Sequence, residues 1–286
     1  MKKSILLLLC AIMTLSFVAC STDQEPEIPS TSEVSSTPEV SSTPTIPATS
    51  ISDFTYSKVQ NGITIDKYLG EEDNVTIPAK IGNDSVVAIS NDAFQNAKIK
   101  AVNIPDSVTT IGARAFMNCK NLTNIHLGNG LKEIKASAFA FCTALKEITF
   151  PEGIEHLWGA AFSCCFSLEE IYIPKSVTVL YDHCFANCTA LKSITIEEGL
   201  KEIGMNAFYG TAVESIIIPA SIEKMGTDTF DHCDSLRSIT FLGDAPTING
   251  IIPLGTLNEN LIIYYNANTS GWDTTKLKDW YTLVAK

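Results

Sequence analysis

Nine cysteines are the residues of this sequence best suited to chemistry, and seven of them lie between residues 119 and 233. Cysteine side chains bind zinc, form disulfides or act as nucleophiles, and each role demands its own arrangement in space. Most of these seven recur at intervals of about 23 residues, and a threonine takes the same place once. The recurring residues are Cys119, Cys142, Cys165, Cys188, Thr211 and Cys233.

A regular spacing makes a row of equivalent positions, whereas a zinc ion needs four ligands that converge on one point. A position that accepts Thr211 requires a small, weakly polar side chain and does not require a thiol. We therefore expect a buried structural ladder, with no metal site and no cofactor. Cys184 stands where other units have alanine or threonine and is assigned to the core, while Cys164 has no evident role. Disulfides between adjacent turns are sterically feasible, but an odd number of cysteines leaves at least one unpaired.

The four histidines fall at different places in the repeat and are not expected to form one site. His183 and Cys184 are adjacent in sequence, and adjacent side chains on a strand or turn point apart, which argues against a catalytic pair. The sequence has no nucleophile elbow, HExxH motif or phosphate-binding glycine loop. Many acidic residues alternate with lysine, as in Lys132-Glu133, which is typical of a solvated strand face. We predict that the protein is not an enzyme.

The cysteine row belongs to a repeating unit whose first regular copy is the 23-residue stretch from Val102 to Asn124. One such unit has its apolar side chains on one side and cannot close a core alone. Stacking units in register buries each column of side chains against the same column of its neighbours, which is the principle of a solenoid. Further copies start at Ile125, Ile148, Ile171, Ile194, Ile216 and Ile239. The fifteenth position is always phenylalanine: Phe116, Phe139, Phe162, Phe185, Phe208 and Phe230.

Each unit contains two pieces with alternating apolar residues, Ile-x-Ile and Val-x-x-Ile, which predict short parallel β-strands. The Ala-Phe-x-Asn-Cys piece is short and rich in small residues, which predicts one short helical turn per repeat. Gly112, Gly204 and Gly226 are expected to form a corner of the unit. We predict a right-handed solenoid of about eight turns of 22–23 residues, with a cap at each end.

The motif Ile104-Pro105-x-Ser107-Val108-Thr109-x-Ile111-Gly112-x-x-Ala115-Phe116-x-Asn118-Cys119-x-x-Leu122 resembles the BspA-like leucine-rich repeat family. The resemblance extends over about residues 54–286 and recurs in six or more units. It implies a leucine-rich repeat solenoid on a bacterial cell-surface or secreted protein, and some family members adhere to host matrix proteins. The motif describes a fold and transfers neither a ligand nor a binding residue.

The N-terminal fifty residues have a different composition. Residues 1–19 have a basic start and an apolar core, as a signal peptide has. The end of this segment, Phe17-Val18-Ala19-Cys20, resembles the lipobox of bacterial lipoproteins, which implies lipid attachment at Cys20; the alternative is an ordinary secretory leader. Residues 20–50 are rich in serine, threonine and proline and predict a disordered tether.

The repeat region is expected to begin with a cap and first repeat at 51–101, followed by regular repeats at 102–248 and a C-terminal cap at 249–286. Within the last segment we expect a final strand over residues 261–265. Trp272 and Trp280 are expected to form an aromatic plug over the last turn.

Partner binding is expected at surface positions where one unit departs from the others. The eleventh position reads Gly112, Lys135, Trp158, Tyr181, Gly204 and Gly226. The second position is mostly uncharged and reads Asn103, His126, Thr149, Tyr172, Thr195, Ile217, Thr240 and Ile263. Phe166 stands where other units have smaller or polar residues. We hypothesise that Trp158 and Tyr181, with Phe166 and Tyr172, bind a partner; the alternative is that they fill space at a corner.

The net charge of −12 argues against nucleic acid, whose binding depends on lysine and arginine. The first functional hypothesis is an exported, lipid-anchored cell-surface protein that binds proteins, with host matrix as one class of ligand. The alternatives are a structural or self-associating envelope protein without a host ligand, and a carbohydrate-binding module.

Overall fold

The computed structural model describes residues 49–248, 254 and 260–286. The expected signal peptide, the lipid-attachment residue Cys20 and the expected tether up to residue 48 lie outside the described residues. Residues 249–253 and 255–259 of the expected C-terminal cap also lie outside them.

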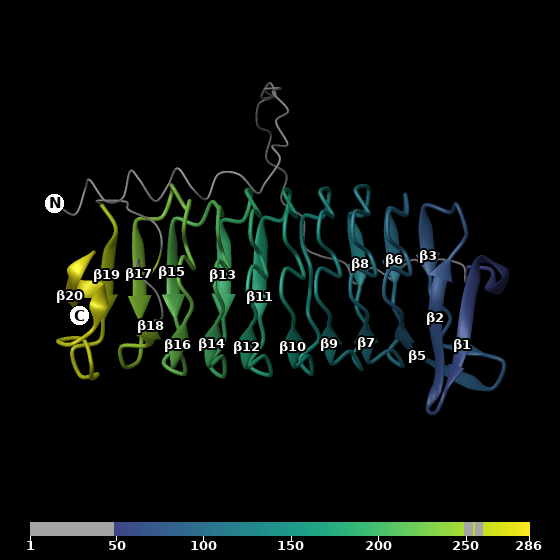
Figure 1. Ribbon diagram of the computed structural model, residues 1–286, viewed down its shortest axis with the longest axis horizontal. Coiled ribbons are helices and arrows are strands. Elements are labelled where there is room, and N and C mark those ends of the chain that lie inside the picture. The colour runs from purple at the N-terminus through teal and green to yellow at the C-terminus, as the bar shows by residue number, and fades with distance from the viewer. Residues whose placement is uncertain (1–48, 249–253, 255–259) are drawn as a thin grey trace, which may run out of the picture. The chain divides into compact units, whose positions relative to one another are not determined.

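The repeat region is a parallel β-solenoid of about nine turns that are about 23 residues apart (Figure 1). The predicted leucine-rich repeat solenoid is therefore confirmed, with one turn more than the expected eight. The N-terminal region was expected to contribute one repeat, but it contributes two parallel strands to the same sheet as the regular repeats, β2 (Gly62–Tyr68) and β5 (Asp84–Ile89).

One face of the solenoid is an eleven-stranded sheet, called the long sheet below. Its regular strands pair in parallel and in register, as between Leu157 of β10 and Leu180 of β12. Two antiparallel strands join it at the N-terminal end, β1 beside β2 and β4 beside β5. The remaining members are β1 (Phe54–Val59), β4 (Lys80–Ile81), β7 (Thr110–Ile111), β9 (Glu133–Ile134), β10 (His156–Leu157), β12 (Val179–Leu180), β14 (Glu202–Ile203), β16 (Lys224–Met225) and β18 (Thr247–Ile248).

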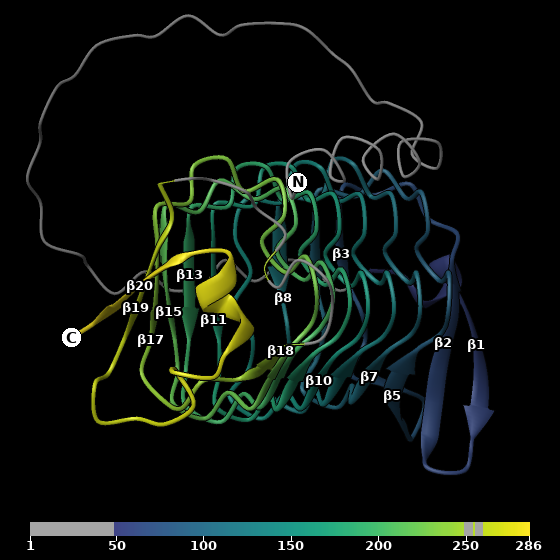
Figure 2. The same cartoon turned by 60° about the vertical axis from the view of Figure 1, so that its left-hand side comes forward.

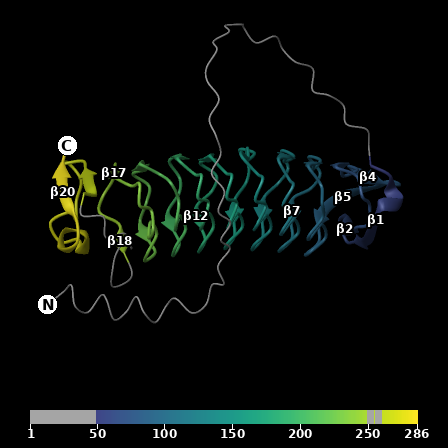
Figure 3. The same ribbon diagram turned by 90° about the horizontal axis from the view of Figure 1, so that it is seen from above.

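A second face carries three shorter parallel sheets, called the short sheets below, and Figure 3 shows the successive turns from above. The sheets are β3 (Asn74–Thr76), β6 (Ala101–Asn103) and β8 (Asn124–His126); β11 (Glu170–Ile173) and β13 (Ser193–Ile196); and β15 (Ser215–Ile218), β17 (Ser238–Phe241), β19 (Ile262–Tyr265) and β20 (Thr282–Ala285). The break between β13 and β15 coincides with the unit that contains Thr211, which is one residue shorter than the others.

The short helical turn predicted for each repeat is absent from the third side of the solenoid. The structure forms no helix in the regular repeats from 102 to 248, so this prediction was wrong. Alternate amides donate along the solenoid axis to the next turn, as Phe116 does to the carbonyl of Ala138 at 2.7 Å. The amides between them close tight turns, as from Met117 to the carbonyl of Arg114 at 3.0 Å. Arg114 and Asn118 also adopt positive φ, so the segment cannot continue as an α-helix.

A stack of phenylalanine rings runs through the interior, and Figure 2 shows the turns that enclose it one behind another. Phe116 and Phe139 have ring centroids 5.0 Å apart and planes within 2° of parallel. Burying a side chain of this size contributes about 1.5–3 kcal/mol, and a stacked pair adds about 0.5–1.5 kcal/mol. The repeat is therefore stabilised by contacts between turns, as a solenoid requires.

The N-terminal end is closed by the 3-10 helix η1 (Ile51–Asp53) and by the β1–β2 pair. Tyr68 stacks on Phe94 at 5.1 Å and extends the phenylalanine stack. The hydroxyl of Thr49 accepts a hydrogen bond from the amide of Thr76 at 2.9 Å, which satisfies a donor on the outer strand β3.

The C-terminal end differs from the prediction in two respects. Strand β19 is followed by the 3-10 helix η2 (Lys276–Asp279) and by a further parallel strand, β20, so residues 261–265 do not supply the final strand. Trp272 is buried and contacts Phe241 at a centroid distance of 5.2 Å, as a plug should. Trp280, which directly follows η2, is 36% exposed and takes no part in that contact.

Candidate partner-binding site

Trp158 and Tyr181 lie together at the corner that directly follows strands β10 and β12 of the long sheet. Their ring centroids are 4.5 Å apart and their planes are inclined by 14°, so the two rings are stacked face to face. The register of β10 with β12 fixes this pairing, since it places the two residues in the same column of adjacent turns. We call this pair the aromatic stack.

The indole of the aromatic stack is also held from the preceding turn. Nε1 of Trp158 donates to Oε2 of Glu133 at 3.3 Å. The other carboxylate oxygen of Glu133 accepts from the hydroxyl of Thr110 at 3.1 Å, so the acceptor is itself oriented. His156 lies beside the indole at a centroid distance of 5.9 Å. Both aromatic residues are half-buried, so they are anchored on the surface and not free in solvent.

The other two candidate residues lie elsewhere, so the four do not form one patch. Tyr172 belongs to β11 in the short sheets and is 41% exposed. The pKa of its hydroxyl is raised, chiefly because the side chain is partly shielded from water and secondly because the carboxylates of Glu197 and Glu152 lie nearby. Phe166 is half-buried on the turn segment after Cys165.

The second-position column of the short sheets needs one correction. The register pairs Thr240 with Tyr264, so Tyr264 continues the exposed column and Ile263 is fully buried. The expected residue was wrong by one because the link between β17 and β19 is longer than a regular repeat. Ile217, at 59%, is the most exposed large apolar residue in that column.

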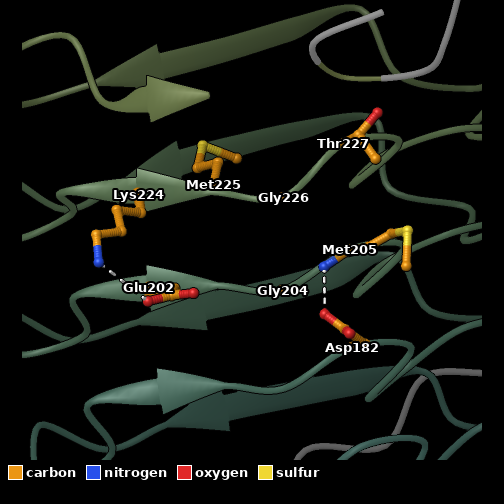
Figure 4. Close-up of a pocket in the computed structure, with 8 residues that line it drawn as sticks. All are labelled: Asp182, Glu202, Gly204, Met205, Lys224, Met225, Gly226 and Thr227. Atoms are coloured by element: carbon orange, nitrogen blue, oxygen red, sulfur yellow. Dashed lines mark hydrogen bonds and ion pairs between the residues drawn. The ribbon is translucent and has the colours of Figure 1, made fainter. Parts of the chain in front are cut away.

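A pocket of about 380 Å³ lies on the long sheet, one turn beyond the aromatic stack (Figure 4). Glu202 and Lys224 lie on one side of it, and Asp182, Met205 and Thr227 lie on the other. Gly204 and Gly226, which occupy the same column as Trp158 and Tyr181, lie between the two sides, with Met225 completing the lining. This pocket was not predicted from the sequence, although two glycines that follow two aromatic residues in one column are a signal for it.

The glycines of the pocket are required by the close approach of neighbouring turns. A Cβ atom on Gly204 would lie 2.6 Å from the backbone nitrogen of Asp182, and one on Gly226 would lie 2.3 Å from that of Met205. Both distances are shorter than real Cβ contacts. The absence of side chains here leaves the backbone as the floor of the pocket.

The cysteine ladder is buried throughout. Each thiol in it donates to the carbonyl of a phenylalanine in the preceding turn, as Cys119 does to Phe94 at 3.1 Å. The corresponding bonds of Cys142, Cys165, Cys188 and Cys233 measure 3.3, 3.2, 3.2 and 3.1 Å. Thr211 and Cys233 contact one another at 3.2 Å. Burial raises the pKa of the Cys119 thiol to about 12, and burial raises the pKa of the other ladder thiols as well.

The two cysteines outside the ladder, Cys164 and Cys184, do not join a metal-binding group within the described ranges. Cys184 is fully buried and its thiol faces the carbonyl of Leu157 at 3.9 Å, while Cys164 is half-buried. All seven described cysteines are free thiols. The described residues contain no group of three or more histidine, cysteine, aspartate or glutamate side chains placed to hold a metal ion. They also contain no helix with the length and apolar character to span a membrane.

Comparisons with known proteins agree with this architecture. The model of the BspA type leucine rich repeat region matches residues 73–192 and 159–252, with six copies. A leucine rich cell surface protein from Faecalibacterium prausnitzii A2-165 is 32% identical with a TM-score of 0.63, over 70% of this chain and 56% of that one. The chain thus spans little more than half the length of that relative. A leucine rich repeat protein from T. pallidum is 27% identical with a TM-score of 0.53, over 76% of this chain and 86% of that one. None of the curated proteins matches the chain.

Proposed function

Because the chain belongs to the BspA-type leucine-rich repeat family, we propose that it is a lipid-anchored cell-surface protein whose solenoid binds another protein. Repeat solenoids bind through columns of side chains on an extended surface. Host matrix proteins and proteins of the cell envelope are the two classes of partner to test. The aromatic stack of Trp158 and Tyr181 is the observation that carries this proposal.

The stack has the properties of a binding hot spot. Tryptophan and tyrosine are enriched at the centres of protein interfaces, where they supply a large contact area. The contact of each ring with the other, and the bond from Trp158 to Glu133, restrict both side chains before a partner arrives. A partner therefore immobilises few free rotamers on binding, which lowers the entropic cost of association.

Export and anchoring are supported by the apolar leader, the lipobox-like sequence ending at Cys20 and the Ser/Thr/Pro-rich segment that follows it. The relative from Faecalibacterium prausnitzii is described as a cell surface protein. Growth with radioactive palmitate should label the wild-type chain and leave a Cys20→Ala variant unlabelled. Equal labelling of the two chains would exclude lipid attachment at this residue.

The binding proposal is tested by giving the stack the residues that neighbouring units already tolerate. Trp158→Lys copies Lys135, and Tyr181→Gly copies Gly204, so both changes are compatible with the solenoid. Fragment 45–286, which forms one compact unit, is immobilised and exposed to fibronectin, to fibrinogen and to an extract of the cell envelope. We expect the double variant to lose at least tenfold in affinity for the partner that the wild type binds, as removal of hot-spot side chains does.

A matched control separates the two faces of the solenoid. Tyr172→Thr copies Thr149 and Thr195 of its own column on the short sheets and should leave binding unchanged. Loss of binding with Tyr172→Thr alone would place the interface on the other face. Unchanged binding by a folded double variant would refute the proposed role of the stack.

A further inference from the structure

The pocket beside the aromatic stack is lined by two carboxylates and one ammonium group. Asp182 and Glu202 contribute carboxylates on opposite sides, and Lys224 is the only cationic side chain in the lining. Nζ of Lys224 lies 3.8 Å from Glu202, and the two side chains are 59% and 46% exposed. An exposed pair at this distance is weak and easily exchanged for a better partner.

The second carboxylate is positioned by the backbone. Oδ1 of Asp182 accepts a hydrogen bond from the amide of Met205 at 2.7 Å, as the dashed line in Figure 4 marks. This bond holds the carboxylate at the rim of the pocket. Met205 is 38% exposed beside it and offers an apolar wall.

We infer that this pocket receives an arginine side chain of the protein partner, an inference that rests on the proposed binding function. A guanidinium group is planar and carries five N–H donors, so it fits a flat glycine floor and can bond carboxylates on two sides. Its aliphatic stem packs against apolar side chains such as Met205. The net charge of −12 favours encounter with a basic partner.

Two features favour arginine over the other ligands that an acidic surface pocket attracts. A lysine ammonium is a compact charge and cannot bond in a fixed plane to acceptors on opposite sides. A sugar ring binds best on an open aromatic face, but no aromatic residue lines the pocket, and Trp158 and Tyr181 each cover one face of the other.

The pocket and the stack fit beneath one partner. Trp158, Tyr181, Gly204 and Gly226 occupy one column in four adjacent turns. With strands about 4.8 Å apart, this column extends over about 15 Å, which is well within the footprint of a protein interface. Tryptophan, tyrosine and arginine are the residue types that dominate interface energetics, so the site would combine two on this chain with one from the partner.

The inference is tested with a small probe that contains no partner protein. The full chain carrying Cys20→Ala is labelled with ¹⁵N and titrated with N-acetyl-arginine amide, with the neutral citrulline analogue and with methyl glucoside. We expect the arginine probe to shift the amide signals of Gly204, Met205 and Gly226, and to bind about tenfold more tightly than citrulline.

Two variants then remove the charges singly. Glu202→Gln and Asp182→Asn should each weaken binding of the arginine probe about tenfold. In Asp182→Asn the side-chain amide oxygen can still accept the bond from the Met205 amide, so the charge is removed without the anchor. The control is Glu155→Gln, which removes a carboxylate paired with Lys132 outside the pocket and should have no effect.

Absence of shifts at the pocket, equal binding of citrulline, a response to the glucoside alone, or unchanged binding by both pocket variants would each overturn the inference. These outcomes leave the proposed function untouched, because that is measured with whole proteins and with variants of the stack. Conversely, if the stack variants do not change protein binding, the titration with the arginine probe still tests the pocket by itself.

Discussion

Two columns of the same repeat differ in how much their residues vary: the eighteenth is nearly uniform and the eleventh is variable. The eighteenth is the buried ladder, where the structure accepts cysteine and once threonine, and each thiol donates to a phenylalanine carbonyl of the preceding turn. The eleventh lies on the surface and holds glycine, lysine, tryptophan or tyrosine. The eighteenth column is nearly uniform because every turn encloses the same interior space.

The variation of the eleventh column creates the only local features of the described surface that we connect with binding. Large residues in two turns give the aromatic stack, and glycines in the next two give the pocket. A change in one column thus produces a projection and a recess side by side, without a change in the fold. Function in such a repeat is expected where copies differ, and stability where they agree.

The largest effect should come from ionising the buried ladder. Burial raises the pKa of Cys119 to about 12, above the value of about 8.5 for an exposed thiol. The raised pKa means that stability is fully present below about pH 8.5 and is lost as pH rises toward 12, by about 1.4 kcal/mol per pH unit for each such thiol. With several ladder thiols, we expect urea unfolding in reductant to show a collapse of stability by about pH 11. In Cys119→Thr the fall should be shallower by one thiol, and an identical curve would contradict the assignment.

The next effect concerns the recess. Gly226→Leu places a Cβ atom 2.3 Å from the backbone nitrogen of Met205, and backbone cannot move aside cheaply. We expect a loss of about 1–3 kcal/mol in the free energy of unfolding, as in other overpacked sites. The comparison is Gly153→Ala at another position of the repeat, where the nearest atom to an added Cβ is the flexible Nζ of Lys132 at 3.4 Å. If Gly226→Leu costs no more stability than Gly153→Ala, the close approach of the Met205 backbone does not exclude a side chain at Gly226.

Removing a side chain of the aromatic stack should destabilise the solenoid less than filling the pocket at Gly226 does. Trp158→Gly removes a half-buried indole and its stacking, for a loss of about 1–2 kcal/mol. A double-mutant cycle with Tyr181→Gly should give a coupling of about 0.5–1.5 kcal/mol, measured by urea unfolding. Lys135→Gly, in the same column without a stacked partner, is the control for the backbone effect of glycine. A coupling near zero would reduce the stack to two independent side chains.

Much of the fold was accessible from the sequence because its causes are periodic. The invariant phenylalanines and the small residues before them predict a stacked interior, and the solenoid contains that stack. The helical turn was predicted wrongly because apolar spacing does not reveal that alternate amides bond to the next turn. Positive φ at non-glycine residues such as Arg114 leaves no clear mark in the sequence.

The site was accessible only in part. Comparison of copies identified Trp158 and Tyr181, because a departure from a column is visible in one sequence. It also grouped Tyr172 and Phe166 with them, since similar departures in neighbouring units do not say which side of a turn each occupies. The pocket was missed because Gly204 and Gly226 were interpreted only as residues of a corner, whereas their missing side chains also leave a recess beside the two aromatic residues.

The smallest effect on stability is expected for Glu202→Gln, the variant that also tests arginine binding in the pocket. Glu202 forms one exposed, loose pair with Lys224 at 3.8 Å, so Glu202→Gln should change the free energy of unfolding by less than about 0.5 kcal/mol. Glu133→Ala, by contrast, removes the acceptor of Trp158 and Thr110 and should cost about 1 kcal/mol. Thermal unfolding of both variants measures this difference. If Glu202→Gln destabilises the solenoid as much as Glu133→Ala, the pocket carboxylate belongs to the scaffold; if it does not, any loss of arginine binding in that variant must arise in the pocket itself.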